Sequence, residues 1–386
     1  MKPIISIIIF LGLIVRLFCI YNLPWTNSSD LNNYFWAGFQ TAQGRSPYRL
    51  WAQHLTGPRS DVLPLELALL SLVVSLGKTP LALRGLFLLA DAAVLFLATR
   101  VLKDQPRRQL WWTFLYALTP GPLYFFTMTP SDKPLLLAGV LAVLWLAQRS
   151  DRRRVCWFLA LVAGLLAGFK WLGLFIAFPI AWSCGRRRMI PASLLLLSVG
   201  LIFGLSHLLW FPDWMIVYQF RQMRFGPPLH SGLAVLLQAI GLPMPPLYLP
   251  LMIASWALIQ ILYLRGCIQL PATLVFSILA ILLWAPDTTA QMLFWLMLLV
   301  LLVVNWEQPV WIALVLVSTT WMTLMAAAAI GQVIPGLPLV DRLTGLSGPY
   351  GGIPLALWSH LPLALLALRI LGFLRYASAR DLHRPL

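Results

Sequence analysis

Charged side chains are scarce in this sequence of 386 residues, at 10% of the chain, and acidic ones are scarcest, with 12 Asp and Glu against 28 Lys and Arg. Soluble domains carry about 25% charged residues, too many to leave long uncharged runs. Here 60% of residues are hydrophobic, and apolar runs of roughly 15 to 22 residues recur, near the ~20 that cross a membrane as a helix. The composition excludes an ordinary soluble domain and predicts an all-α polytopic integral membrane protein.

Metal ligands are not clustered either. The four cysteines stand far apart, in or beside apolar runs, and no His, Cys or Asp cluster shows metal-ligand spacing. We therefore expect free thiols, no cofactor and no metal site. The net charge of +16 comes from basic residues in short turns between apolar runs. That pattern signals membrane topology, so we expect no nucleic-acid partner.

Lys and Arg clusters predict which turns face the cytoplasm, because short cytoplasmic loops are enriched in these residues. The clusters are RVLKDQPRR (100–108), RSDRRR (149–154), GRRR (185–188) and the C-terminal tail. With both chain ends also inside, the alternation predicts about twelve spans. We expect them near 4–22, 83–100, 111–128, 134–148, 155–169, 171–184, 191–210, 247–264, 268–285, 291–305, 310–330 and 353–374.

Three segments need a special interpretation. The first run has no small-residue cleavage site after it and is read as a retained anchor, with Arg16 near its outer end and reaching the headgroups. Residues 62–77 would reverse the topology if they crossed, so we place them as a juxtamembrane or re-entrant helix in a long outer loop, 23–82. A true crossing is the alternative. The pair 155–169 and 171–184 is short for two full spans, which favours a broken helix with Lys170 at its turn.

The outer segments of this map gather most of the polar chemistry. Basic residues are normally rare in outer loops, so those here need a reason. A bound phosphate is one, since the arginine fork and the lysine point charge both suit phosphate oxygens. Contact with phospholipid headgroups is the other. The residues concerned include Arg49, Lys133, Lys170, Arg221 and Arg224, with His54, Asp132, His230 and Gln291 among their polar neighbours.

Asp30 stands where the first span ends. A carboxylate at the membrane surface, partly desolvated by the loop, could act as a general base toward an attacking hydroxyl. The structural alternative is a helix N-cap, because SSDLNNYFWAGFQTAQG (28–44) is typical of a cap followed by a short amphipathic helix that ends at Gly44. Asp132 has the same alternative, as the cap of a span with Pro134 in its first turn.

Four stretches together resemble the GT-C superfamily of membrane glycosyltransferases, and most closely its polyprenyl-phosphate-mannose-dependent branch. They are YFWAG with GRSPYR after Asp30, ALTPGPLYFFTMTPSDKP (117–134), AGLLAGFKWLGLFIAFPIAW (163–182) and APDTTAQMLFW (285–295). Their order and their placement on one membrane face carry the likeness, which runs from about residue 5 to about residue 300. The chain departs from the family pattern at two places. TTAQM replaces the family's Ser-Pro-Gln-Tyr. Asn32 stands where some members have a second acid, and the loss of that acid argues against a metal site.

The resemblance implies an inverting transfer of a sugar, mannose by analogy, from a polyprenyl-phosphate donor to a lipid or glycan acceptor on the extracytoplasmic face. It implies a catalytic module over 1–305, completed by C-terminal helices over 306–386 in one membrane domain, in a bacterial inner or plasma membrane. Asp30 would be the base. Lys170, Arg221, Arg224, Arg49 and Lys133 would bind the donor phosphate; Tyr34, Tyr48, His54, Asp132, His230 and Gln291 would bind substrate.

Two other classes of protein share parts of this pattern. A transporter or flippase for a lipid-linked or anionic substrate would have a similar helix count, but it usually shows twofold repeats and ionisable residues at the membrane midplane. A noncatalytic lipid-binding scaffold would keep the fold without a base, whereas Asp30 is present. The outer position of the ionisable residues favours the enzyme.

Overall fold

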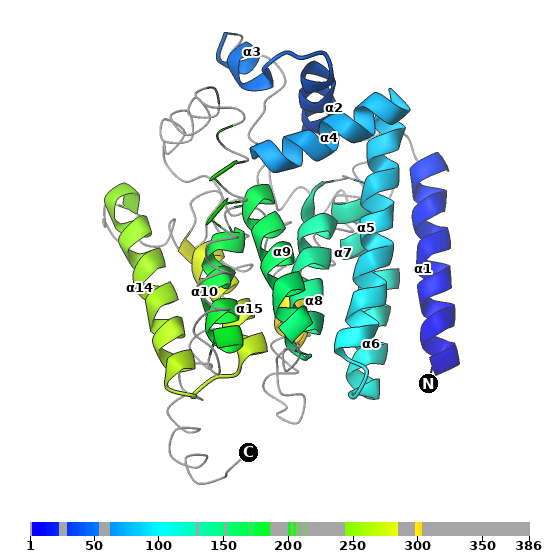
Figure 1. Ribbon diagram of the computed structural model, residues 1–386. Helices are drawn as coiled ribbons and strands as arrows, with labels where there is room; N and C mark the ends of the chain where they lie inside the picture. Colours follow the sequence, from blue (N-terminus) through cyan, green and yellow to red (C-terminus); the bar gives the residue numbers. More distant parts are fainter. Residues whose placement is uncertain are drawn as a thin grey trace. The chain divides into compact units, whose positions relative to one another are not determined.

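The computed structural model describes residues 2–22, 29–53, 62–128, 131–149, 153–170, 172–185, 244–284 and 298–302, with isolated positions between 200 and 213. Regular structure in these ranges is helical, without strands, in agreement with the predicted all-α class (Figure 1). The chain forms two compact units, Met1–Gly226 and Pro227–Leu386. The predicted division at residue 305 stays a prediction.

Most of the expected apolar helices are present with nearly the expected ends. The first unit holds α1 (Lys2–Asn22), α2 (Ser29–Ala42), α3 (Pro47–Gln53), α4 (Pro64–Gly77), α5 (Pro80–Val101), α6 (Pro106–Leu118), α7 (Pro120–Pro122), a π-helical turn (Leu123–Met128), α8 (Lys133–Ala147), α9 (Arg153–Phe169) and α10 (Leu172–Gly185); the second holds α14 (Met244–Leu264) and α15 (Leu270–Trp284). Of the described helices, α1 and α5 are long and apolar enough to span a membrane. The spans expected at 191–210, 291–305, 310–330 and 353–374 lie outside the described residues, apart from a few positions.

The single helix expected over 111–128 is wrong, because the chain breaks before Pro120. Thr119 adopts an extended conformation, with φ −81° and ψ 151°. A residue before proline is disfavoured in the helical region, and proline itself cannot donate the helical hydrogen bond. The chain therefore continues as the short α7 and the π-helical turn, which lead it to the polar turn before α8.

Residues 62–77 do form a helix, α4, and it does not run alongside the long helices of its unit. Figure 1 shows α4 lying across the line of α5. It packs most extensively against α2. The two helices approach closely at Gly38, where an added Cβ would lie 2.9 Å from the carbonyl oxygen of Leu70. Whether α4 enters the membrane stays a prediction.

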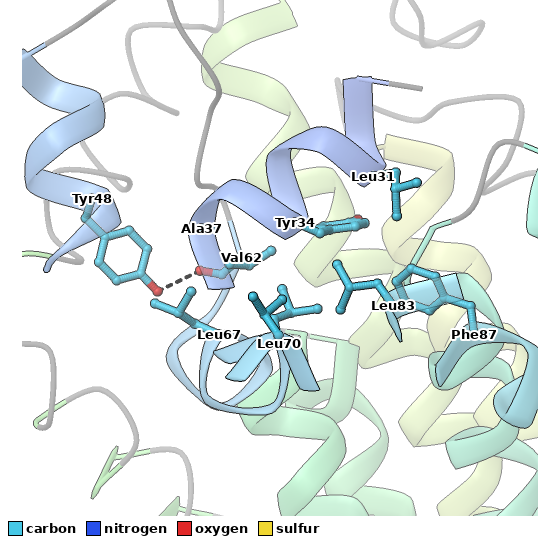
Figure 2. Packing of buried hydrophobic residues seen from close by; sticks show 10 residues of the cluster. Leu31, Tyr34, Ala37, Tyr48, Val62, Leu67, Leu70, Leu83 and Phe87 are labelled. Atoms are coloured by element: carbon cyan, nitrogen blue, oxygen red, sulfur yellow. Dashed lines mark hydrogen bonds between the residues drawn. The ribbon is translucent and has the colours of Figure 1, made fainter. Parts of the chain in front are cut away.

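A buried apolar cluster fixes α2 and α4 on the end of α5 (Figure 2). Leu31 and Tyr34 of α2 meet Leu67 of α4 and Phe87 of α5, and the Tyr34 and Phe87 rings pack edge to face with centroids 6.1 Å apart. Burying such side chains contributes roughly 1.5 to 3 kcal/mol each. The cluster therefore holds one face of α2 in a set position, which becomes important for Tyr34 below.

Arg16 does not reach the headgroups as expected; its side chain is fully buried between helices. Its Nε donates to Asp91 Oδ2 of α5 at 3.1 Å, and its terminal nitrogens donate to the carbonyls of Tyr116 at 2.8 Å and Ala117 at 2.7 Å. The Tyr116 hydroxyl donates to the other oxygen of Asp91. A carboxylate on a neighbouring span pairs better with a buried guanidinium than distant headgroups do, so α1, α5 and α6 are tied together.

Removing one member of this pair is expected to be strongly destabilising. Arg16→Met leaves the Asp91 carboxylate buried and uncompensated, so the free energy of unfolding should fall by about 3 to 5 kcal/mol. Arg16→Met combined with Asp91→Leu should recover much of that loss, because neither charge remains. Denaturant unfolding of the detergent-solubilised chain is measured for these two variants and for Asp91→Leu alone. A double variant that loses the sum of the two single effects would show that the pair is not coupled.

Candidate functional site

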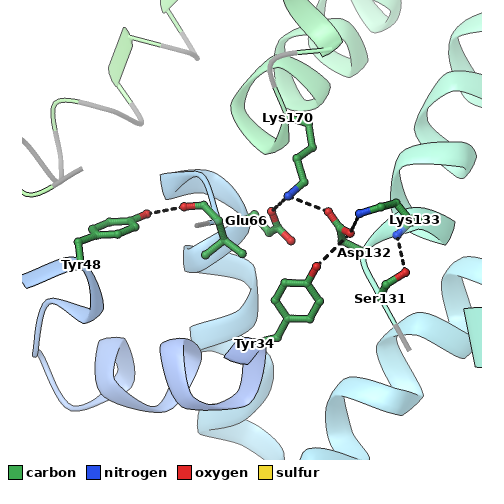
Figure 3. A network of polar contacts seen from close by, with 8 residues as sticks. Tyr34, Tyr48, Glu66, Ser131, Asp132, Lys133 and Lys170 are labelled. Carbon is green, nitrogen blue, oxygen red and sulfur yellow. Dashed lines mark hydrogen bonds and ion pairs between the residues drawn. The ribbon is translucent and has the colours of Figure 1, made fainter. Parts of the chain in front are cut away.

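Four polar side chains from segments far apart in the sequence meet beside α4 in the first unit (Figure 3). Tyr34 comes from α2, Glu66 from the first turn of α4, Asp132 from the turn before α8 and Lys170 from the turn after α9. We call these residues, together with Lys133, the polar cluster. The sequence map had placed all four of these segments on one membrane face, and the fold brings them into contact.

The carboxylate of Asp132 is the centre of the polar cluster. Its Oδ1 accepts hydrogen bonds from the Tyr34 hydroxyl at 3.1 Å and from Lys133 Nζ at 2.5 Å, and its Oδ2 lies 2.9 Å from Lys170 Nζ. Burial by itself would raise the pKa of Asp132, but the two ammonium groups outweigh it and the pKa falls below its usual range. Asp132 therefore stays ionised.

The expected capping role of Asp132 is only half right. Helix α8 does begin at Lys133 with Pro134 in its first turn, but the Asp132 side chain makes no capping hydrogen bond to that helix. The Lys133 amide instead donates to Ser131 Oγ at 3.5 Å. Two nearby ammonium groups attract the carboxylate more strongly than backbone amides do, since charge-assisted contacts are the stronger ones.

Lys170 stands in a tight helical break, as the sequence predicted. Helix α9 ends at Phe169 and α10 begins at Leu172. The chain turns back tightly enough that position 173 requires glycine, because a Cβ there would collide with the backbone around Ala167. The Lys170 side chain keeps 20% of its surface exposed, against 9% for Lys133 and 2% for Asp132. Lys170 is thus the most accessible member of this charged group.

Glu66 is a member of the polar cluster that the sequence interpretation did not assign. It is 1% exposed, and its Oε2 lies 3.2 Å from Lys170 Nζ, as an ion-pair contact. Within the described part of the chain, Oε1 has no hydrogen-bond partner. Burial, with a smaller effect from Asp132, raises the pKa of Glu66 to about 8 despite Lys170 and Lys133. One signal was present in the sequence: an acid inside an apolar helix needs a partner.

Asp30, the predicted base, lies in the first turn of α2 and is half-buried. It precedes Tyr34 by four residues, so the two side chains share one face of the helix about one turn apart. The expected short helix is present, and Gly44 follows it with a positive φ of 73°. Because Tyr34 contacts Asp132, this face of α2 leads directly to the polar cluster.

The remaining predicted site residues lie elsewhere. The buried Tyr48 donates its hydroxyl to the Val62 carbonyl at 2.8 Å, which ties α3 to the start of α4 (Figures 2 and 3). Arg49 is largely exposed and pairs with Asp213 at 2.9 Å. His54, Arg221, Arg224, His230 and Gln291 lie outside the described residues, and their roles stay predictions.

No group of three or more His, Cys, Asp or Glu side chains that could hold a metal ion occurs in the described ranges. The two carboxyl groups of the polar cluster are instead joined by an ammonium group. The arrangement can hold a small anion beside Lys170, because a lysine ammonium is a common ligand of phosphate.

Comparison with protein-family models gives no matching family, and comparison with curated proteins gives no match. The assignment of a class of protein therefore rests on the motifs of the chain and on the geometry of the polar cluster.

Glu66→Gln is expected to stabilise the folded chain in a pH-dependent way. The pKa of Glu66 rises from 4.5 to about 8 on folding. Between those values the unfolded chain releases a proton that the folded chain retains, so stability is lost as pH rises from about 4.5 to about 8. The neutral glutamine has no such loss. The variant should equal the wild type below about pH 4.5 and exceed it by about 2 to 5 kcal/mol above pH 8.

Unfolding in detergent across this pH range measures the difference. Asp104→Asn is the matched control, since the Asp104 side chain is 86% exposed. A stability difference between wild type and Glu66→Gln that does not change with pH would contradict the proton assignment.

Proposed function

We propose that the chain is an integral membrane glycosyltransferase of the GT-C type, with about twelve membrane helices, both ends in the cytoplasm and an extracytoplasmic active site. It transfers a sugar, mannose by the motif resemblance, from a polyprenyl-phosphate donor to a lipid or glycan acceptor. The observation that carries this proposal is that Tyr34 and Lys170 both contact Asp132, while Asp30 lies one helical turn before Tyr34 on the same face of α2. A base and a phosphate ligand in neighbouring positions suit a transfer between a hydroxyl and a sugar phosphate.

In this reaction Asp30 accepts the proton of the acceptor hydroxyl while the oxygen bonds to the anomeric carbon of the sugar. The bond from that carbon to the donor phosphate oxygen breaks, and its electron pair leaves with the phosphate. Attack opposite the leaving group inverts the configuration, so a β-linked donor gives an α-linked product. A cation placed at the departing phosphate lowers the barrier, because negative charge grows there in the transition state.

The charges of the polar cluster support Lys170 as that cation. Lys133 and Lys170 bring two positive charges, Asp132 brings one negative charge, and Glu66 carries a proton at neutral pH because its pKa is raised to about 8. The group is thus positive by one unit, and Lys170 is its most exposed member. Lys133, buried against Asp132, supports the carboxylate that orients Lys170.

One observation favours the transporter alternative, namely the buried Arg16–Asp91 pair inside the two helices of membrane-spanning length. Ionisable residues deep in a membrane often mark a transport pathway. However, the Arg16 guanidinium is already bound to Asp91 and to the carbonyls of Tyr116 and Ala117. We interpret this pair as structural. A transporter would also move the lipid-linked sugar without releasing polyprenyl phosphate, which the following assay detects.

Asp30→Asn is expected to abolish sugar transfer. Membranes containing the full chain are supplied with polyprenyl-phosphate mannose radiolabelled in the sugar, and labelled product and released polyprenyl phosphate are measured. Loss of a general base should lower the rate by about 10²- to 10⁴-fold at equal expression. Asp104→Asn, the same change at an exposed site, should leave the rate unchanged. Transfer by Asp30→Asn at the wild-type rate would remove Asp30 from the mechanism.

Lys170→Gln is expected to lower kcat by about 10²-fold, since it removes charge stabilisation that acts on the leaving phosphate. The exposed Lys103 provides the matched control, Lys103→Gln, with no expected change. Initial rates at several donor concentrations separate kcat from KM. A raised KM with unchanged kcat would show that Lys170 only binds the donor and does not assist its departure.

A further inference from the structure

We propose that Glu66 is a positioning residue that sets the charge of the donor site: the site binds a lipid phosphate while Glu66 is protonated, and ionised Glu66 holds Lys170 away from it. This inference rests on the proposed function, because it takes Lys170 as the ligand of the donor phosphate. It adds a proton-dependent step to binding and places that step on one residue of α4.

The geometry distinguishes the two carboxyl groups of the polar cluster. Asp132 accepts hydrogen bonds from Tyr34 and Lys133 through Oδ1 and has an ion-pair contact with Lys170 through Oδ2, whereas among the described residues Glu66 has the ion-pair contact with Lys170 through Oε2. No described side chain donates a hydrogen bond to Glu66 Oε1. Ionising this buried carboxyl group is therefore costly, since burial disfavours charge that is not compensated by hydrogen bonds. The proton of the cluster therefore belongs on Glu66 and not on Asp132.

Lys170 is shared between these two carboxyl groups and is the only one of the three with appreciable exposure, at 20%. While Glu66 is neutral, the polar cluster holds one carboxylate, Asp132, against two ammonium groups, and its net positive charge favours an anion. When Glu66 ionises, it pairs with Lys170 and the cluster becomes neutral. A phosphate would then have to compete with a carboxylate already 3.2 Å from Nζ.

Among the described residues, three charged side chains set the electrostatic environment of Glu66. The electrostatic effects on Glu66 come from Lys170, Asp132 and Lys133. Helix α4 packs against α2, α5 and α9, and Gly168 lets α9 approach it at Leu65, beside Glu66. The other charged or titratable side chains on those three helices are Asp30 and Tyr34 on α2, Arg84, Asp91 and Arg100 on α5, and Arg153, Arg154 and Cys156 on α9.

Because phosphate and ionised Glu66 compete for Lys170, binding of the phosphate is coupled to protonation of Glu66. Above the pKa of Glu66, which is raised to about 8, binding of the phosphate must be accompanied by uptake of one proton on Glu66. The affinity of the wild type should then fall about tenfold for each further pH unit, because the protonated fraction falls by that factor. Below the pKa the affinity should be independent of Glu66.

The test uses the purified full chain in detergent and farnesyl phosphate, a short polyprenyl monophosphate, as the probe. Its dissociation constant is measured between about pH 6 and about pH 10 for the wild type and for Glu66→Gln, which keeps the shape of protonated glutamate. The ionisation of the probe itself affects both proteins equally. We expect weakening above about pH 8 in the wild type and no such break in Glu66→Gln. Glu66→Asp, which keeps a titratable group, should restore a break.

Identical pH profiles for wild type and Glu66→Gln would overturn the inference, as would failure of the probe to bind at any pH. A stability difference alone would not produce the expected result, because that difference develops between about pH 4.5 and about pH 8 and stays constant above pH 8, where the break in affinity is expected. Asp104→Asn, at its exposed position, should follow the wild-type profile.

Two further comparisons separate this inference from the proposed function. Phosphatidic acid carries the same phosphate chemistry on a glycerolipid; equal affinity with the same break would keep the role of Glu66 but assign the site to lipid headgroups in general. If the profiles coincide while Asp30→Asn abolishes transfer, the inference fails and the enzyme stands. If the break is found but wild-type membranes transfer no sugar, the lipid-phosphate site stands without the transferase.

Discussion

The carboxylate of Asp132 is the interaction on which the rest of this site depends. It receives Tyr34, Lys133 and Lys170 from three separate segments, and without it the buried Lys133 would lose its carboxylate partner. Charge that leaves water has to find opposite charge, because the cost of desolvation exceeds what a single neutral contact returns. This constraint brings the turn before α8 against the break after α9, and so builds one site from residues distant in sequence.

The need to pair buried charges also explains the contact between Arg16 and Asp91, which joins α1 to α5. There every nitrogen of the guanidinium has an acceptor. The two sites differ in how completely their groups are paired. Every nitrogen of Arg16 has an acceptor and the side chain serves the fold, whereas in the described part of the chain Glu66 Oε1 has no hydrogen-bond partner and Lys170 is partly exposed. The partly exposed Lys170 therefore makes the polar cluster the better candidate of the two for binding a ligand.

Apolar packing beside the polar cluster holds the side chains of that cluster in position. Leu31, Tyr34, Leu67 and Phe87 fix α2 and α4 on α5, so the phenol of Tyr34 reaches Asp132 with little freedom to move. A reaction that needs a base and a leaving-group ligand at a fixed separation benefits from such rigidity, since misplacement by about 1 Å costs rate. Helix α4 contributes to the site in two ways: Leu67 packs in the buried apolar cluster, and Glu66 belongs to the polar cluster.

The sequence by itself determined most of the described helices, because apolar runs set their length and prolines set where α4, α5, α6 and α8 begin. The exception is the helix expected over 111–128, which breaks before Pro120. The sequence also determined the break at Lys170 and the polar turn at Asp132, which are local properties of a few residues. Only the tertiary structure decided the partners: that Arg16 meets Asp91 and does not reach the headgroups, and that Glu66 lies against Lys170. The physical reason is that the pairing of buried charges depends on which helices pack together, and an apolar pattern along one helix does not specify its neighbours.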